Sequence, residues 1–333
     1  MKKHKRTLII FSIFAMISII SYLCFWMLTT EYILFPDDPT QSAYMKQAII
    51  KIISRKSIQV LAMVIAAVLI ATTSLVFQTL THNRILTPSL IGFDAIFVLT
   101  QTAIVFFLSD KSIFYSNPYL NFIITALLML VVSLIMYRLI LRKNKNNMIF
   151  LLLFGMILST FSKNFSSFLQ TVMDPNQFQS VAIHTEVTIS HMNTSIILLV
   201  VPLMMMLIFL FIREFKYFDV MSLGETQAIN LGVNYHKKMN LSLVYIAIAM
   251  SISTALIGPI SFLGLIAVNA SREILKSYKH LELMFLSSFI AIILLVLGQT
   301  IIVEMGYMTT VTVFISLFGG IYMIYLVLKE NTK

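Results

Sequence analysis

Two ionisable side chains, Asp94 and Lys163, stand within otherwise apolar stretches of this 333-residue chain. Charged groups inside a membrane are costly, and those that occur often carry protons or coupling ions. Lys163 falls about 22 Å along a helix that would begin at Met148, so its long side chain can also reach the outer membrane interface. We favour this plainer interpretation and expect no proton relay through either residue.

A second group of potential ligands is His184, Glu186 and His191, with the spacing H-x-E-x4-H. Imidazole and carboxylate groups suit a transition metal, but no predicted helix brings these three side chains to one point. We therefore expect neither a bound metal nor a cofactor, and we interpret the 21 methionines as packing residues. Motifs of ATP-binding loops and common hydrolases are missing from the sequence, so the chain is not expected to be an enzyme.

Composition excludes a water-soluble globule, because 59% of the residues are hydrophobic and only 11% are charged, where soluble domains carry roughly 25%. The net charge of +10 would suit a nucleic acid, but the placement of the basic residues favours anchoring at a lipid membrane instead. The single cysteine, Cys24, lies in an apolar run, which excludes a disulfide framework.

Apolar stretches of about 20 residues predict membrane-spanning helices, and together they define an all-α membrane protein without separable domains. A shorter stretch after Gly258-Pro259, Ile260 to Ala270, predicts a half-length helix buried in the bundle. We expect ten membrane-embedded helices in one bundle, the other nine being Thr7–Leu28, Ser57–Leu80, Ile91–Leu108, Pro118–Leu141, Met148–Gln170, Ser195–Ile212, Leu241–Ile257, Leu281–Val303 and Val311–Leu328.

The basic residues orient these helices. With the N-terminus inside, the cytoplasmic segments hold 18 of the 24 Lys and Arg residues and the outer segments hold 5. This bias predicts a multi-pass protein of the bacterial plasma membrane with both termini in the cytoplasm.

The longest polar insertion on the inner side runs from Phe218 to Met239. Gly224 and Gly232 would break it into two short helical stretches, with Ala228 and Leu231 on one face. Two interpretations remain open from the pattern alone: a segment that docks into a cytoplasmic motor protein, or an amphipathic loop lying on lipid headgroups.

The letters LGETQAINLGVN in this insertion resemble the coupling segment of the FecCD/BtuC-like permeases, which import iron–siderophore complexes and vitamin B12. Residues in register with the family pattern are Leu223, Gly224, Glu225, Ala228, Leu231, Gly232, Val233 and Asn234. Three further blocks occur in family order: the GPISFLGL string from Gly258, the string from Gln78 to Gly92, and Gly155 with Leu158 and Ser159. Departures, such as Gln299 in place of a membrane Asp, make the vitamin B12 branch less fitting than a divergent siderophore branch.

The resemblance implies a single ABC-importer permease domain over residues 1–333, with residues 218–239 as its coupling segment. It implies cytoplasmic ATP-binding subunits, an extracytoplasmic siderophore-binding protein and a second permease, more often a different chain than an identical copy. Basic residues before the second span, here Arg55 and Lys56, would receive the binding protein. Polar residues expected along the path are Gln78, Asn83, Ser159 and Thr160, with Thr72, Thr73, Ser74 and Ser162 as further candidates.

Two other functions remain alternatives at this point. An ion-coupled secondary transporter would need paired charges inside the membrane, and only Asp94 and Lys163 are available. A receptor or scaffold without a transport role would leave the coupling segment without a nucleotide-hydrolysing partner.

Overall fold

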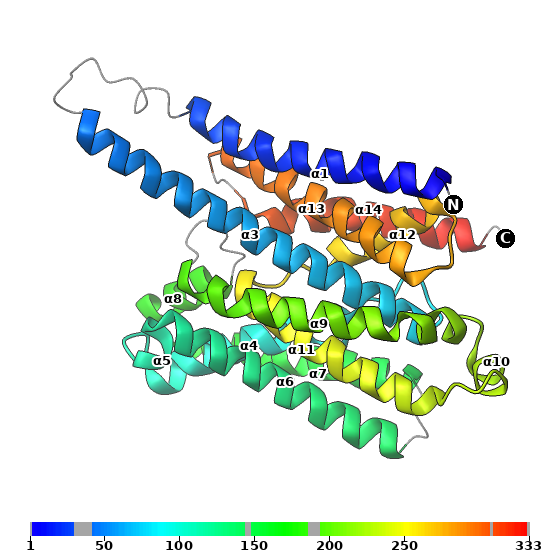
Figure 1. The fold of residues 1–333 in the computed structure, drawn as a ribbon. Helices are drawn as coiled ribbons and strands as arrows, with labels where there is room; N and C mark the ends of the chain where they lie inside the picture. Colours follow the sequence, from blue (N-terminus) through cyan, green and yellow to red (C-terminus); the bar gives the residue numbers. More distant parts are fainter. Residues whose placement is uncertain (1, 30–41, 144–147, 186–193, 307–308, 332–333) are drawn as a thin grey trace.

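The computed structural model describes residues 2–29, 42–143, 148–185, 194–306 and 309–331, which form helices joined by turns (Figure 1). Because a bilayer offers no water to backbone groups, apolar stretches satisfy their N–H and C=O groups within helices. Among the described residues, eight helices are long and apolar enough to cross a membrane. They are α1 (Lys2–Thr29), α3 (Ser42–Leu80), α6 (Pro118–Lys143), α7 (Met148–Val172), α9 (Thr194–Met221), α11 (Tyr235–Ile257), α13 (His280–Glu304) and α14 (Val311–Asn331).

Two shorter helices complete the bundle, α4 (Phe93–Leu108) and α12 (Leu263–Leu275). The expectation of an all-α fold with ten embedded helices is confirmed, and the half-length helix after Gly258-Pro259 is α12. Short helices lie at the ends of the bundle, namely η2 (Pro88–Ile91), α5 (Ile113–Ser116), α8 (Pro175–Thr185) and α10 (Glu225–Asn230). Both chain ends lie at the same end as α10, whereas α5 and α8 lie at the opposite end (Figure 1).

Three helices form the centre of the bundle. The most apolar windows of α3, α11 and α13 are 83%, 67% and 61% buried, whereas those of α1, α7 and α14 are only 17% buried. α12 packs between α3 and α13, and α4 packs on α7. The outer helices therefore present most of their apolar surface to lipid or to another protein chain.

Glycines permit two of the closest helix contacts. A Cβ atom on Gly264 of α12 would lie 2.0 Å from the Ser74 hydroxyl on α3. A Cβ atom on Gly155 of α7 would lie 2.8 Å from the Cα atom of Ile91. Small residues let membrane helices approach backbone to backbone, so these contacts explain the glycines in two of the sequence blocks.

α3 is longer than a membrane crossing requires. Its 39 residues extend about 58 Å at about 1.5 Å per residue, against a hydrocarbon core of about 30 Å. Its N-terminal part projects beyond the bundle at the end opposite to the chain termini (Figure 1).

Candidate coupling segment and translocation path

The polar insertion contains one short helix. α9 ends at Met221, Gly224 turns the chain with a φ of +109°, and α10 follows. Gly232 has a φ of +83°, a conformation that glycine adopts at little cost. The expectation of two short helical stretches is wrong, because the second stretch is the first turn of the membrane helix α11. The Asn234 side chain caps that turn by accepting the backbone N–H of Lys237 at 3.2 Å.

Apolar side chains protrude from this segment. Ala228 is fully buried and holds α10 against the bundle, while Leu231 is 63% exposed just beyond the helix end. These two residues therefore do not share an environment, contrary to the expectation from their spacing. Leu223 and Ile229 are also exposed, at 59% and 49%. Exposed apolar groups clustered at a polar end of a protein are typical of an interaction surface, and sequence reasoning missed Ile229.

Ion pairs connect the coupling segment to the ends of the neighbouring membrane helices. The Glu225 carboxylate lies 3.4 Å from the His236 ring nitrogen across the loop between α10 and α11. At the ends of α9 and α11, Lys238 Nζ lies 2.6 Å from Glu214 Oε2 and 3.6 Å from the ring centroid of Tyr217. The exposed Glu225 pair contributes little, whereas the half-buried Lys238 ammonium is held by both a carboxylate and an aromatic face.

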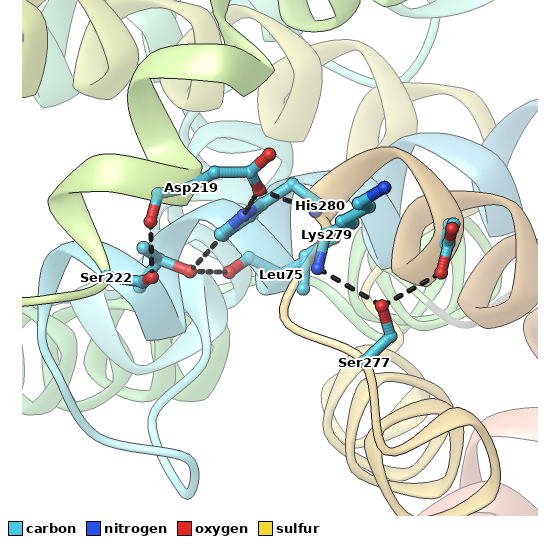
Figure 2. Close-up of polar contacts among 8 residues, drawn as sticks. Leu75, Asp219, Ser222, Ser277, Lys279 and His280 are labelled. Carbon is cyan, nitrogen blue, oxygen red and sulfur yellow. Dashed lines mark hydrogen bonds and ion pairs between the residues drawn. The ribbon is translucent and has the colours of Figure 1, made fainter. Parts of the chain in front are cut away.

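A buried polar cluster joins the end of α9 to the centre of the bundle (Figure 2). The Asp219 carboxylate accepts the backbone N–H of His280 at 2.8 Å and lies 2.6 Å from the ring Nδ1. The other ring nitrogen, Nε2, lies 2.8 Å from the hydroxyl of Thr79 on α3. Since Asp219 precedes α10 by only a few residues, this cluster connects the coupling segment to α3 and α13.

Helix α7 carries a polar stripe on its C-terminal half. Thr160, Asn164, Ser167 and Thr171 are exposed and recur every three or four residues, so they share one face of the helix. Lys163 is exposed beside them. Polar groups such as Asn and Lys are disfavoured against lipid tails. This face is therefore suited to water or to another protein chain.

The neighbouring exposed face of α7 is apolar. Phe161, Phe165 and Phe168 stack along it, with successive ring centroids 5.8 and 6.5 Å apart. Toward the N-terminus of α7, two exposed apolar residues, Leu153 and Met156, continue the line of the polar stripe. One exposed face of α7 is therefore apolar and suits contact with lipid. The other exposed face is apolar near the N-terminus of the helix and polar near its C-terminus.

The predicted path residues occupy different environments. Thr160 is exposed on the stripe, although its hydroxyl donates to the Met156 carbonyl at 2.9 Å, and Ser159 is half-buried beside Gly92. Gln78 is buried within the bundle, and its side-chain amide has no partner among the described residues. Asn83 lies in the turn after α3, where its side chain accepts the N–H of Ile85. Asn164, Ser167 and Thr171 were missed, although their helical spacing could have identified them.

The further candidates, Thr72, Thr73, Ser74 and Ser162, are all buried in this subunit.

The two residues expected to receive a binding protein differ in their exposure. Arg55 is exposed, whereas Lys56 is buried and its ammonium lies 5.6 Å from the Tyr22 ring centroid.

Within the described residues, no group of three or more His, Cys, Asp and Glu side chains could hold a metal ion. His184 lies in α8 beside the Tyr115 ring, with centroids 4.4 Å apart. Glu186 and His191 fall outside the described residues, so the H-x-E-x4-H hypothesis is not addressed as a whole.

Comparison with known proteins identifies a family, two relatives and a solved structure that resemble this chain. The family model described as the FecCD transport family matches residues 7–329. The petrobactin import system permease protein YclO of Bacillus subtilis (strain 168) is 42% identical over 83% of this chain and 88% of its own length. The petrobactin import system permease protein FatC of Bacillus anthracis is 30% identical over 85% and 80%. A solved inward-facing ABC transporter, assigned to the metal-chelate type, has the same fold, with a TM-score of 0.80, 18% identity and coverage of 98% and 99%.

Proposed function

The chain belongs to the FecCD transport family, and from this premise we propose that it is the permease subunit of an ABC importer for ferric siderophore complexes. The observation that carries the proposal is its similarity, over more than four fifths of the chain, to permeases of petrobactin import systems. The sequence has no Walker A loop of its own. A partner therefore hydrolyses ATP, and this subunit performs translocation without covalent catalysis.

Residues 1–333 act as one permease domain, and residues 218–239 couple it to cytoplasmic ATP-binding subunits. The exposed apolar side chains Leu223, Ile229 and Leu231 support this role, because they offer a compact surface for a partner. Glycine turns flank the docking helix, and the Asp219–His280 contact joins it to the transport core. Movement of the partner is thereby transmitted to α3 and α13.

A second permease subunit covers the other side of the path. The polar stripe of α7 supports this arrangement, because one face of one subunit cannot enclose a passage for a bulky complex. We assign the second subunit to a different permease, as the string from Asn83 to Pro88 resembles the siderophore branch that pairs unlike chains. The iron arrives wrapped in the oxygen ligands of its carrier, so the passage needs polar contacts rather than metal ligands.

An extracytoplasmic siderophore-binding protein delivers the cargo at the end that carries α5 and α8. Exposed Arg55 on the projecting part of α3 supports docking there. The protein spans the bacterial plasma membrane, with α10 and both termini in the cytoplasm. The excess of Lys and Arg at that end supports this orientation.

Uptake of radioactive iron by bacteria that lack this chain tests the proposal. We expect loss of uptake from one class of ferric siderophore and normal growth on haem or iron salts, with recovery when the chain is restored. Loss of an amino acid or sugar instead would refute the proposal. If an ion gradient, without ATP hydrolysis, drove the uptake in vesicles, the ion-coupled alternative would replace it.

A further inference from the structure

The basic residue on the polar stripe of α7 stands apart from the ion pairs of the bundle. None of the ion pairs of the described residues, such as Lys238–Glu214 and His280–Asp219, involves Lys163. The side chain is exposed, next to Asn164 and one turn from Ser167. An unpaired ammonium on a face that disfavours lipid needs water or an anion as its neighbour.

A carboxylate near this ammonium, Asp94, offsets part of its positive charge. Asp94 lies two residues after Gly92, which packs against Gly155 and Ser159 of α7. One Asp94 oxygen accepts the Ser261 hydroxyl at 2.6 Å, and the other has no partner among the described residues. Lys163 is not within ion-pair distance of Asp94, but the two groups are close enough to interact electrostatically.

We propose that Lys163 is a transit contact in the outer half of the path for ferric complexes that carry net negative charge. The inference rests on the proposed function and adds the class of cargo. Catecholate and carboxylate carriers supply more negative charge than one iron(III) ion neutralises, so their complexes are anions. A single ammonium, partly compensated by Asp94, attracts such an anion without holding it, as a path requires.

Cysteine modification in the assembled importer tests the electrostatic part without any cargo. Starting from Cys24→Ser, which removes the chain's one cysteine, Asn164→Cys places a thiol beside Lys163, and Phe165→Cys places the matched control on the apolar face. The probes are two methanethiosulfonates, one carrying a sulfonate and one a trimethylammonium group. We expect Asn164→Cys to react and Phe165→Cys to stay protected.

The negative reagent should react about tenfold faster than the positive one at position 164, after correction for their rates with a free thiol. Lys163→Gln should abolish this preference, and Lys163→Arg should keep it. Lack of reaction at position 164 would mean that a second subunit covers the stripe, which overturns the proposal. A preference that survives Lys163→Gln overturns it as well.

Iron uptake from an anionic ferric catecholate complex tests the transport part. Lys163→Gln should lower uptake several-fold while ATPase assembly is retained, and Lys163→Arg should restore it. If the wild type imports ferric siderophores and Lys163→Gln imports them equally well, this inference fails and the proposed function stands. If the wild type imports none, the proposed function fails, while the reagent preference still reports on the charge of the face.

Discussion

The Asp219 side chain, at the end of α9, contacts both the backbone N–H and the ring of His280. Asp219→Asn keeps the shape of the side chain, but it removes the negative charge and replaces one acceptor oxygen with an NH2 group. A hydrogen bond to a charged group contributes about 1.5–3 kcal/mol, so we expect a looser junction and fewer iron atoms imported per ATP hydrolysed. Reconstituted importer with its partners gives both rates in one measurement.

A matched control is Asp174→Asn, because Asp174 is exposed just before α8 at the opposite end. His280→Gln should reproduce the uncoupling, since Gln can keep one contact but not those to Asp219 and Thr79 together. An unchanged import-to-hydrolysis ratio in both cluster variants would show that the contact only stabilises the fold.

A second prediction at the scale of single residues concerns the packing around Gly264. In Gly264→Ala the new methyl group would overlap Ser74, which belongs to the buried helix α3. Overpacking in a tight core costs about 1–3 kcal/mol, so the melting temperature in detergent should fall. Ser74→Gly in the same chain should recover much of the loss, and Gly320→Ala, where nothing lies within 4 Å, should melt like the wild type. Equal melting of all variants would contradict the packing.

At the scale of elements, α10 and its flanking turns form the proposed docking surface, and its apolar side chains are exposed. Leu231→Asp should weaken the complex with the ATP-binding subunits by about tenfold or more, because truncating a central apolar contact often costs 1–2 kcal/mol or more. Asn176→Asp, an exposed change in α8 at the opposite end of the bundle, is the control. Co-purification at graded concentrations measures the difference. Equal recovery of both variants would place the docking surface elsewhere.

The sequence predicted the helices more accurately than it predicted which side chains are exposed. Hydrophobic length alone identified the spans, because backbone satisfaction in lipid leaves few alternatives. It could not separate the second half of the coupling segment from α11, because the first turn of α11 is as polar as the loop before it. The sequence could not predict which polar side chains are exposed for a related reason: Thr72 and Thr73 have the same chemistry as Thr160, and only packing shows that the first two are buried on α3 while Thr160 is exposed on α7.

At the scale of the whole molecule, only one of the two basic residues expected to receive the binding protein, Arg55, is exposed, whereas Lys56 is buried. Arg55→Glu should weaken binding of the siderophore-binding protein at low salt and have less effect at 1 M salt, where the Debye length is about 3 Å. Lys56→Glu should instead lower thermal stability, because the buried Lys56 packs over Tyr22. Binding to permease in nanodiscs and melting in detergent separate the two effects. Wild-type binding by Arg55→Glu at low salt would exclude a docking role.

The polar stripe of α7 also bears on how the chain enters the membrane during synthesis. With a mean hydropathy of 1.6, α7 is the least apolar of the eight long spans in the described residues, whereas α6 reaches 2.4. A translocon sorts segments by apolarity, so α7 partitions into lipid less readily than its neighbours. Only residues 144–147 separate it from α6, against which it packs. The two helices are therefore expected to insert as a hairpin, and the polar side chains proposed to line the passage make the biogenesis of α7 depend on α6.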